Sequence, residues 1–147
     1  MYNMNAQQYL RQAYRLDELI KSNQEELQNL REQAVTIGAI DYAKDKIQSS
    51  PKADAPFSNT VMKIIELEES IQADIDKLFA LKLEIRTAIN NMEDADEKLL
   101  LRHRYLNFLQ WDEICDEMHL SMRSVLRIHM SALQNIVVPL KVGTKWH

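Results

Sequence analysis

The chain has few of the residues that interrupt helices or cross-link a fold. Its 147 residues include two Gly, three Pro and one Cys. The scarcity of Gly and Pro, together with abundant Leu, Ile, Ala, Glu, Lys and Gln, predicts an all-α protein made of a few long helices. A single cysteine excludes an internal disulfide and is typical of proteins in a reducing cytoplasm.

Long apolar runs are also missing from the sequence. The first residues, MYNMNAQQYLRQ, are polar where a secretory signal would be apolar, and no stretch is long and apolar enough to span a membrane. We therefore expect a soluble cytoplasmic protein with no membrane partner. A phosphate-binding Gly-rich loop, a Ser-His-Asp order and a nucleophile elbow are all absent, so neither enzymatic activity nor a cofactor is expected.

The net charge of −4 is distributed unevenly along the chain. Residues 1–95 contain 11 basic and 16 acidic side chains, whereas residues 96–147 contain 7 basic and 6 acidic ones. No acidic residue follows Glu117. The positive charges therefore gather near the C-terminus and predict a local anion-binding face. They belong to Arg123, Arg127, Lys141 and Lys145.

A heptad pattern runs from about Asn5 to Ile37, with spacings that alternate between four and three. Such a pattern predicts a long helix that packs along most of its length. Asn23 interrupts the apolar row and either fixes the register or lies at the edge of the seam. The seam positions are Tyr9, Ala13, Leu16, Ile20, Asn23, Leu27, Leu30, Ala34 and Ile37.

Gly38 is expected to end this helix, and residues 38–58 to form a linker, because their prolines forbid a continuous helix. A second long helix is predicted from Ser58 or Asn59 to about Asn91, with an apolar stripe too wide for a single partner. Residues 1–92 thus predict a coiled-coil-like helical hairpin. Its wide stripe is covered either by a homodimer that forms a four-helix bundle or by the C-terminal part of the chain.

Residues 93–138 predict a three-helix head, and residues 139–147 form a short basic tail. The first helix of the head is expected from Glu97 to about Leu106, after an acidic segment that suits a helix N-terminus. Its expected inward residues are Leu99, Leu100, His103 and Leu106, with Arg102 and Arg104 directed toward solvent.

The second and third helices of the head, expected over Trp111–His119 and Ser121–Ile136, have the spacing of a helix-turn-helix. His119 occupies the position that must adopt a left-handed conformation, and Ser121 is a good N-cap. Cys115 supplies the small residue that is needed where the helices cross. The apolar positions of the corner are Ile114, Met118, Leu120, Val125 and Ile128.

Residues 96–134 resemble the promoter-reading C-terminal domain of bacterial sigma factors, region four, in the form found in small phage regulators. The segments LRHRY at 101–105, WDEI at 111–114 and RIH at 127–129 carry this resemblance, together with Ser121, Val125, Ala132 and Leu133. The upstream segments LEESIQADIDKL and QSSPKADA are similar to the coiled-coil half of a phage family from Gram-positive hosts, related to ArpU-like and RinA-like regulators. The resemblance implies a phage late-gene activator in the host bacterial cytoplasm that binds double-stranded DNA and contacts host RNA polymerase.

The chain departs from this family pattern around the corner. His119 replaces the usual Gly, and Cys115 replaces a residue that is often Ala. The second helix of the corner also carries Met122, Leu126 and Met130, where polar or basic side chains are usual. Met122, Leu126 and Leu133 are expected on one flank, which can be buried against the hairpin, whereas Met130 is expected to point away from the core.

Arg123 and Arg127 are the leading candidates for reading DNA, since they are expected on the outward face of this helix. In a major groove each would contact phosphates or bind guanine with two hydrogen bonds, and the alternative is a solvated helix face. Trp111 is expected to anchor the core of the head, with a phosphate contact through its indole N–H as the alternative. Further candidates are Ser121, Met122 and Gln134 on this helix, and Arg102, Arg104, Lys141 and Lys145 as phosphate contacts.

No metal site is predicted from the His and Cys residues, because their spacing does not match that of a known zinc motif. These residues are His103, Cys115, His119 and His129. The acidic pairs Asp112-Glu113 and Asp116-Glu117 are expected to form a solvated helix face rather than an acid/base site.

Two other functions remain open at this point. The apolar residues Met122, Leu126 and Met130 would suit a helix that binds host RNA polymerase or another host protein. A small terminase-like packaging subunit would also be a helical oligomer with a helix-turn-helix.

Overall fold

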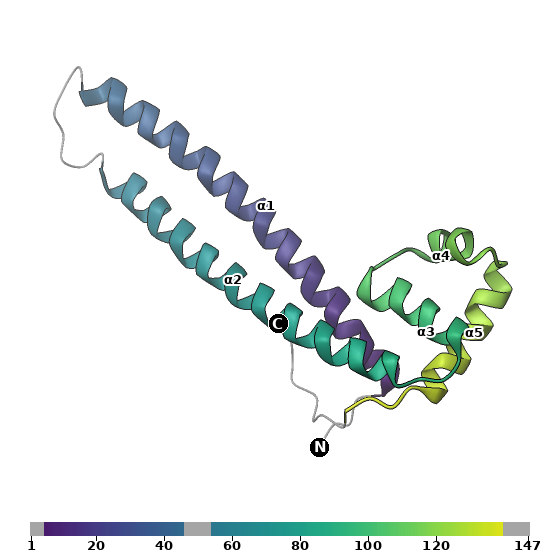
Figure 1. Cartoon of the computed structure of the whole chain (residues 1–147). Coiled ribbons are helices and arrows are strands. Elements are labelled where there is room, and N and C mark those ends of the chain that lie inside the picture. The colour runs from purple at the N-terminus through teal and green to yellow at the C-terminus, as the bar shows by residue number, and fades with distance from the viewer. Residues whose placement is uncertain (1–4, 46–53, 140–147) are drawn as a thin grey trace. The chain divides into compact units, whose positions relative to one another are not determined.

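The computed structural model describes residues 5–45 and 54–139, and all regular structure within these ranges is helical (Figure 1). The predicted all-α class is therefore confirmed. None of the described helices is long and apolar enough to cross a lipid bilayer. The elements are α1 (Ala6–Asp45), α2 (Asp54–Asn90), α3 (Ala95–Leu101), the π-helical turn η2 (Arg102–Leu106), α4 (Trp111–Met118) and α5 (Met122–Asn135).

Contacts group the chain into two compact units. Among the described residues, unit 1 comprises residues 5–17 and 77–139, and unit 2 comprises residues 18–45 and 54–76. Helices α1 and α2 run through both units. This grouping places the first turns of α1 and the end of α2 with the C-terminal helices, whereas the sequence-based division assigns residues 1–92 to one domain.

Unit 1 has one apolar core to which all of its helices contribute. Full burial of an aliphatic side chain stabilises a fold by about 1.5–3 kcal/mol, so a core of this kind decides the local packing. The largest fully buried side chains are Tyr9, Leu10, Ile85, Ile89, Leu100, Leu101, Ile114 and Val125.

Unit 2 consists of the middle and C-terminal part of α1 and the N-terminal part of α2. Its buried apolar side chains include Ile20, Leu27 and Ile71. An exposed ion pair joins Arg31 Nη2 to Glu68 Oε1 at 3.0 Å, and a pair of this kind adds at most about 1 kcal/mol. Packing of the apolar seam therefore holds the two helices together.

The predicted heptad seam of α1 is confirmed. Each of its nine positions from Tyr9 to Ile37 is buried or half-buried, including Asn23. The start of the helix is also as expected, because the Asn5 side chain accepts a hydrogen bond from the Gln8 N–H at 2.8 Å. A side-chain acceptor at this position satisfies one of the N–H groups that lack a helical partner.

The prediction that Gly38 ends α1 is wrong, because the helix continues to Asp45. Glycine costs about 1 kcal/mol in a helix interior, which is too little to end a helix that keeps its packing partner. Phe57 provides such packing, since a Cβ atom at position 38 would lie 3.6 Å from Phe57 Cε2.

The predicted start of α2 at Ser58 or Asn59 is also wrong, because α2 begins at Asp54. Pro56 lies in the first turn, where backbone N–H groups have no helical partner, so a proline is tolerated there. The remainder of the expected linker, residues 46–53, lies outside the described residues.

The first helix of the head begins at Ala95, two residues before the predicted start at Glu97, and then changes its winding. Asp94 caps α3, because its Oδ1 accepts a hydrogen bond from Glu97 N at 2.9 Å. The π-helical turn η2 follows directly, with Asn107 N donating to Arg102 O at 3.0 Å. A π turn inserts an extra residue into the helix and shifts every later side chain around its axis.

The predicted orientations in this helix are partly wrong, both before and within the π-helical turn. Leu99 is 42% exposed instead of buried, and Arg102 and Arg104 are half-buried instead of solvent-facing. The buried face is displaced because Glu97, an acidic residue, is only 7% exposed and takes a core position. Leu100 and Leu106 are buried as expected.

Helices α4 and α5 meet at a tight corner that agrees with its prediction. His119 is left-handed, with φ 55° and ψ 43°, and Ser121 Oγ caps α5 by accepting from Ser124 N at 3.2 Å. The corner is closed by a hydrogen bond from Leu120 N to Cys115 O at 3.1 Å. Of the apolar positions of the corner, Ile114 and Val125 are fully buried, and Met118, Leu120 and Ile128 pack against the same core.

Candidate nucleic-acid interface

Arg123 and Arg127 lie one helical turn apart on the exposed face of α5. The opposite face of this helix buries Val125, His129 and Ala132. Neither guanidinium takes part in an ion pair or a side-chain hydrogen bond with any residue that the structure describes. Because α5 also contains no acidic residue, all the N–H donors of both groups are available to an external anion.

The start of α5 lies close to these arginines in the sequence. The Ser121 hydroxyl accepts from Ser124 N and also donates to Ser124 Oγ at 3.1 Å. Ser121 therefore holds the first turn of α5 in place, which also presents the positive end of the helix dipole. Gln134, near the other end of α5, is exposed.

An apolar strip accompanies the arginines on α5. Met122, Leu126 and Met130 are 42%, 43% and 65% exposed, respectively. Met122 and Leu126 are therefore not covered by the hairpin, because α5 packs mainly on α3 and α4, while Leu133 on the same flank packs against the core. Met130 points outward as expected.

Arg104 is held within unit 1 by two contacts. Its Nη1 donates to the carbonyl oxygen of Leu109 at 2.9 Å, and its guanidinium lies over the Trp111 ring, 4.6 Å from the centroid. A cation–π contact of this type contributes about 0.5–2 kcal/mol. These contacts explain why Arg104 does not point into solvent. Trp111 in turn packs against the core, as predicted.

Arg102 is also tethered. Its Nη1 donates to Asn90 Oδ1 at 3.3 Å, which ties η2 to the end of α2. Arg102 and Arg104 thus each have a side-chain partner within unit 1, unlike Arg123 and Arg127. The two remaining candidates for phosphate contacts, Lys141 and Lys145, lie outside the described residues.

A polar contact that the sequence did not reveal fixes the inner face of α5. The Tyr105 hydroxyl lies 2.7 Å from His129 Nε2, and the Trp111 and His129 rings pack edge-to-face with a centroid distance of 4.7 Å. Burial lowers the pKa of His129 to about 4, with a smaller contribution from the positive charge of Arg104. Burial also raises the pKa of Tyr105. Both groups are therefore neutral at pH 7.

A second buried polar cluster ties α3 to α5. The Glu97 carboxylate accepts hydrogen bonds from Ser131 Oγ at 2.5 Å and from Asn135 Nδ2 at 3.0 Å. These contacts allow an acidic residue to occupy a core position. The sequence signal for this cluster is the pair of polar residues Ser131 and Asn135, which lie one turn apart on the face of α5 that meets α3.

The His and Cys residues considered as metal ligands are dispersed. Cys115 is a half-buried thiol that packs against the core, and His119 is an exposed residue of the corner. Within residues 5–45 and 54–139, no group of three or more His, Cys, Asp or Glu side chains could hold a metal ion.

Comparison with known proteins places the chain in a family without assigning it an activity. Neither the curated proteins nor the solved structures include a match. The model of one family, described as "Protein of unknown function (DUF1492)", matches residues 39–136. The matched region includes α2 and all of the helices that follow it, and it covers more than half of the chain. The chain therefore belongs to this family of proteins of unknown function.

Proposed function

We propose that the protein is a DNA-binding transcriptional regulator, an activator of phage late genes, in which α4 and α5 act as a helix-turn-helix. In this proposal α5 enters the major groove of double-stranded DNA. The observation that carries it is the pair of exposed, unpaired arginines, Arg123 and Arg127, on the outer face of α5. The resemblance of residues 96–134 to sigma region four suggests promoter DNA as the target.

The helix that carries these arginines is held firmly from behind. Val125 and Ala132 are fully buried, and His129 is fixed between them by the Tyr105 hydroxyl. A rigid helix keeps its outer side chains in a constant geometry, which sequence-specific contacts require. At about 1.5 Å per residue, a helix of 14 residues is roughly 21 Å long, enough to lie in a major groove.

The arginines match the chemistry of a guanine edge. Each guanidinium can donate two hydrogen bonds to guanine O6 and N7 in the major groove, and the same groups bind phosphate oxygens. Arg102 and Arg104, held closer to the core, would contribute phosphate contacts that position the helix.

Self-association through unit 2 forms part of the proposal. Its two helix segments bury few apolar residues, while Val35, Met62 and Ile65 are 73%, 53% and 44% exposed. Exposed apolar residues in this density favour packing against a second copy of the chain. A homodimer would present two copies of α5 to a repeated or inverted DNA site. Light scattering on the full chain should give the mass of a dimer. A ring-sized mass would favour a packaging subunit instead.

The first test is selection of bound sequences from a random DNA library, followed by affinity measurements on the selected site. We expect Arg127→Ala to weaken binding by 1–3 kcal/mol, about 5-fold to 150-fold. Arg86→Ala, which removes an exposed arginine from α2 in the same unit, is the matched control and should leave the affinity unchanged. Equal affinities for the two variants would contradict the proposal.

A second candidate function rests on the exposed strip of α5. Met122, Leu126 and Met130 are spaced four residues apart, so they line one side of the helix and could bind a protein partner such as host RNA polymerase. Purified polymerase that is retained after nuclease treatment, and lost with Leu126→Lys, would favour this function. Retention that depends on DNA would favour the first.

A further inference from the structure

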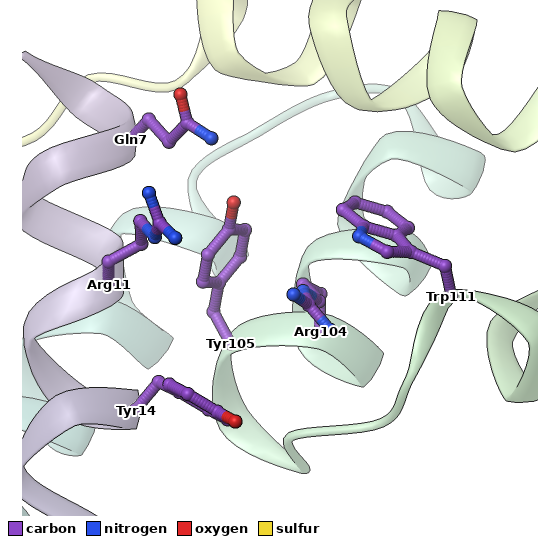
Figure 2. A pocket seen from close by; sticks show the side chains of 6 residues that line it. All are labelled: Gln7, Arg11, Tyr14, Arg104, Tyr105 and Trp111. Atoms are coloured by element: carbon purple, nitrogen blue, oxygen red, sulfur yellow. The ribbon is translucent and has the colours of Figure 1, made fainter.

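A cavity of about 290 Å³ lies within unit 1, on the side where η2 faces the first turns of α1 (Figure 2). Its volume is near the lower end of the range for sites that bind small molecules. The lining contains two cationic and three aromatic side chains and no acidic one. The lining residues are Gln7, Arg11, Tyr14, Arg104, Tyr105 and Trp111.

The guanidinium groups of Arg11 and Arg104 both influence Tyr105 in the cavity wall. The positive charges of Arg104 and Arg11 both lower the pKa of Tyr105, against the larger effect of burial, which raises it. Both arginines line the same cavity as Tyr105, and Figure 2 shows the Arg11 side chain extending from α1 toward that ring. Neither arginine forms an ion pair with any described residue. Two such charges repel each other unless an anion lies between them.

The walls of the cavity are preorganised. Arg104 is fixed by the Leu109 carbonyl and the Trp111 ring. Tyr14 packs edge-to-face on Phe108 at a centroid distance of 5.8 Å, and Phe108 has a left-handed backbone with φ 57°. A bulky residue in this conformation costs free energy, so its surroundings must hold it there. Arg11 and Gln7, which are exposed on α1, are left to adjust to a ligand.

We propose that this cavity binds the phosphoryl group of a small phosphomonoester between Arg11 and Arg104, with the rest of the ligand against the aromatic rings. A phosphomonoester carries nearly two negative charges at pH 7 and so matches both guanidinium groups, whereas a carboxylate would neutralise only one. Planar guanidinium forks bind phosphate oxygens in pairs, and rings such as Tyr14 offer a surface for an aromatic or nucleobase group.

The phosphate group that the cavity binds could belong to a small phosphomonoester or to the backbone of DNA. The two sources are separated by measuring binding of phenyl phosphate and inorganic phosphate in the absence of DNA, and then asking whether phenyl phosphate competes with DNA. Binding in the absence of DNA does not depend on the function proposed above, so the two proposals can fail separately.

The experiment is calorimetric titration of the full chain with phenyl phosphate, supported by Trp111 fluorescence in a Trp146→Phe background. We expect saturable binding, and we expect Arg11→Gln to weaken it by about tenfold or more. The loss of a hydrogen bond to a charged group changes a dissociation constant by about this factor. Arg15→Gln, which removes another exposed arginine one turn further along α1, should bind like the unchanged protein.

Absence of saturable binding would overturn the proposal, and so would equal effects of Arg11→Gln and Arg15→Gln. Circular dichroism checks that the two variants keep the same helix content. Competition between phenyl phosphate and DNA, together with weaker DNA binding by Arg11→Gln, would identify the DNA backbone as the source. Binding without competition would identify a free phosphomonoester.

Discussion

The Tyr105 hydroxyl and His129 Nε2, 2.7 Å apart, connect η2 to the buried face of α5. His129 occupies a helix position between Arg127 and Met130, so the residue that anchors this helix is a close neighbour of the arginines on its outer face. A titratable group therefore supports the surface that we propose contacts DNA, and its protonation should affect folding and binding together.

The first prediction concerns pH. The pKa of His129 is about 4 in the folded chain against an ordinary value of 6.5, so the folded state disfavours the protonated ring. This contribution to stability is fully present above pH 6.5 and is lost as the pH falls from 6.5 toward 4. The free energy of unfolding should fall by about 3 kcal/mol over this range from His129 alone.

Urea unfolding at several pH values between 7.5 and 4 measures this effect. His129→Gln keeps a polar side chain that does not titrate, so the pH dependence of its unfolding free energy should be shallower. Parallel curves for the two proteins would show that His129 is not buried in its neutral form. Tyr105→Phe should destabilise the chain by about 1–3 kcal/mol at pH 7, because it leaves the His129 ring nitrogen without its partner.

The second prediction concerns Glu97. Replacing it with Ala removes the acceptor of the Ser131 and Asn135 hydrogen bonds, and should cost about 1.5–3 kcal/mol of unfolding free energy. Asp96→Ala is the matched control, because Asp96 is an exposed acid in the first turn of α3. Its cost should be about 0.3–1 kcal/mol, from the helix dipole alone. Equal costs would mean that the Glu97 cluster adds no net stability.

The third prediction concerns the corner between α4 and α5. His119 has the left-handed backbone that glycine adopts without strain, so His119→Gly should stabilise the chain by about 0.5–1 kcal/mol. Glu117→Gly, at an exposed helical position two residues earlier, should instead destabilise it by about 1 kcal/mol. Thermal unfolding of both variants gives the comparison, and a destabilising His119→Gly would show that the histidine side chain has a structural role of its own.

The fourth prediction concerns unit 2. Gly38 lies inside α1, and a Cβ atom there would make an ordinary contact with Phe57 at 3.6 Å. Gly38→Ala should therefore raise the unfolding free energy by about 0.5–1 kcal/mol. Ala39→Gly, the reverse change at the next position, should lower it by a similar amount. A loss of stability in Gly38→Ala would indicate that the backbone at 38 must approach another group more closely than a side chain allows.

Sequence patterns were sufficient where spacing alone decides the structure. The seam of α1, the left-handed His119 and the cap at Ser121 follow from apolar periodicity and local backbone chemistry, and each is confirmed. These features depend on residues within one or two helical turns, so a single sequence contains the relevant information.

Two of the errors came from contacts between residues far apart in the chain. Gly38 was predicted to end α1 because its packing against Phe57 was unknown. Leu99 was predicted to face inward, whereas Glu97 takes a core position, where Ser131 and Asn135 satisfy its carboxylate. In each case a tertiary partner outweighed the local preference.

The candidate site was only partly predictable for the same reason. Periodicity placed Arg123 and Arg127 outward, and the structure agrees. It could not show that Arg104 is drawn in by the Leu109 carbonyl, nor that Met122 and Leu126 stay exposed. The π-helical turn that repositions Arg104 has no signature in residue spacing.

Protection of guanine N7 from methylation tests most directly whether α5 reads the major groove. Dimethyl sulphate is applied to the selected DNA at saturating concentrations of the unchanged protein, Arg127→Ala and Arg86→Ala, because guanine N7 lies in the major groove and is covered by a bound arginine. The predicted result is at least one guanine that the unchanged protein and Arg86→Ala protect and Arg127→Ala does not. An identical pattern for all three proteins, or no protected guanine, would contradict a role for α5 in the groove.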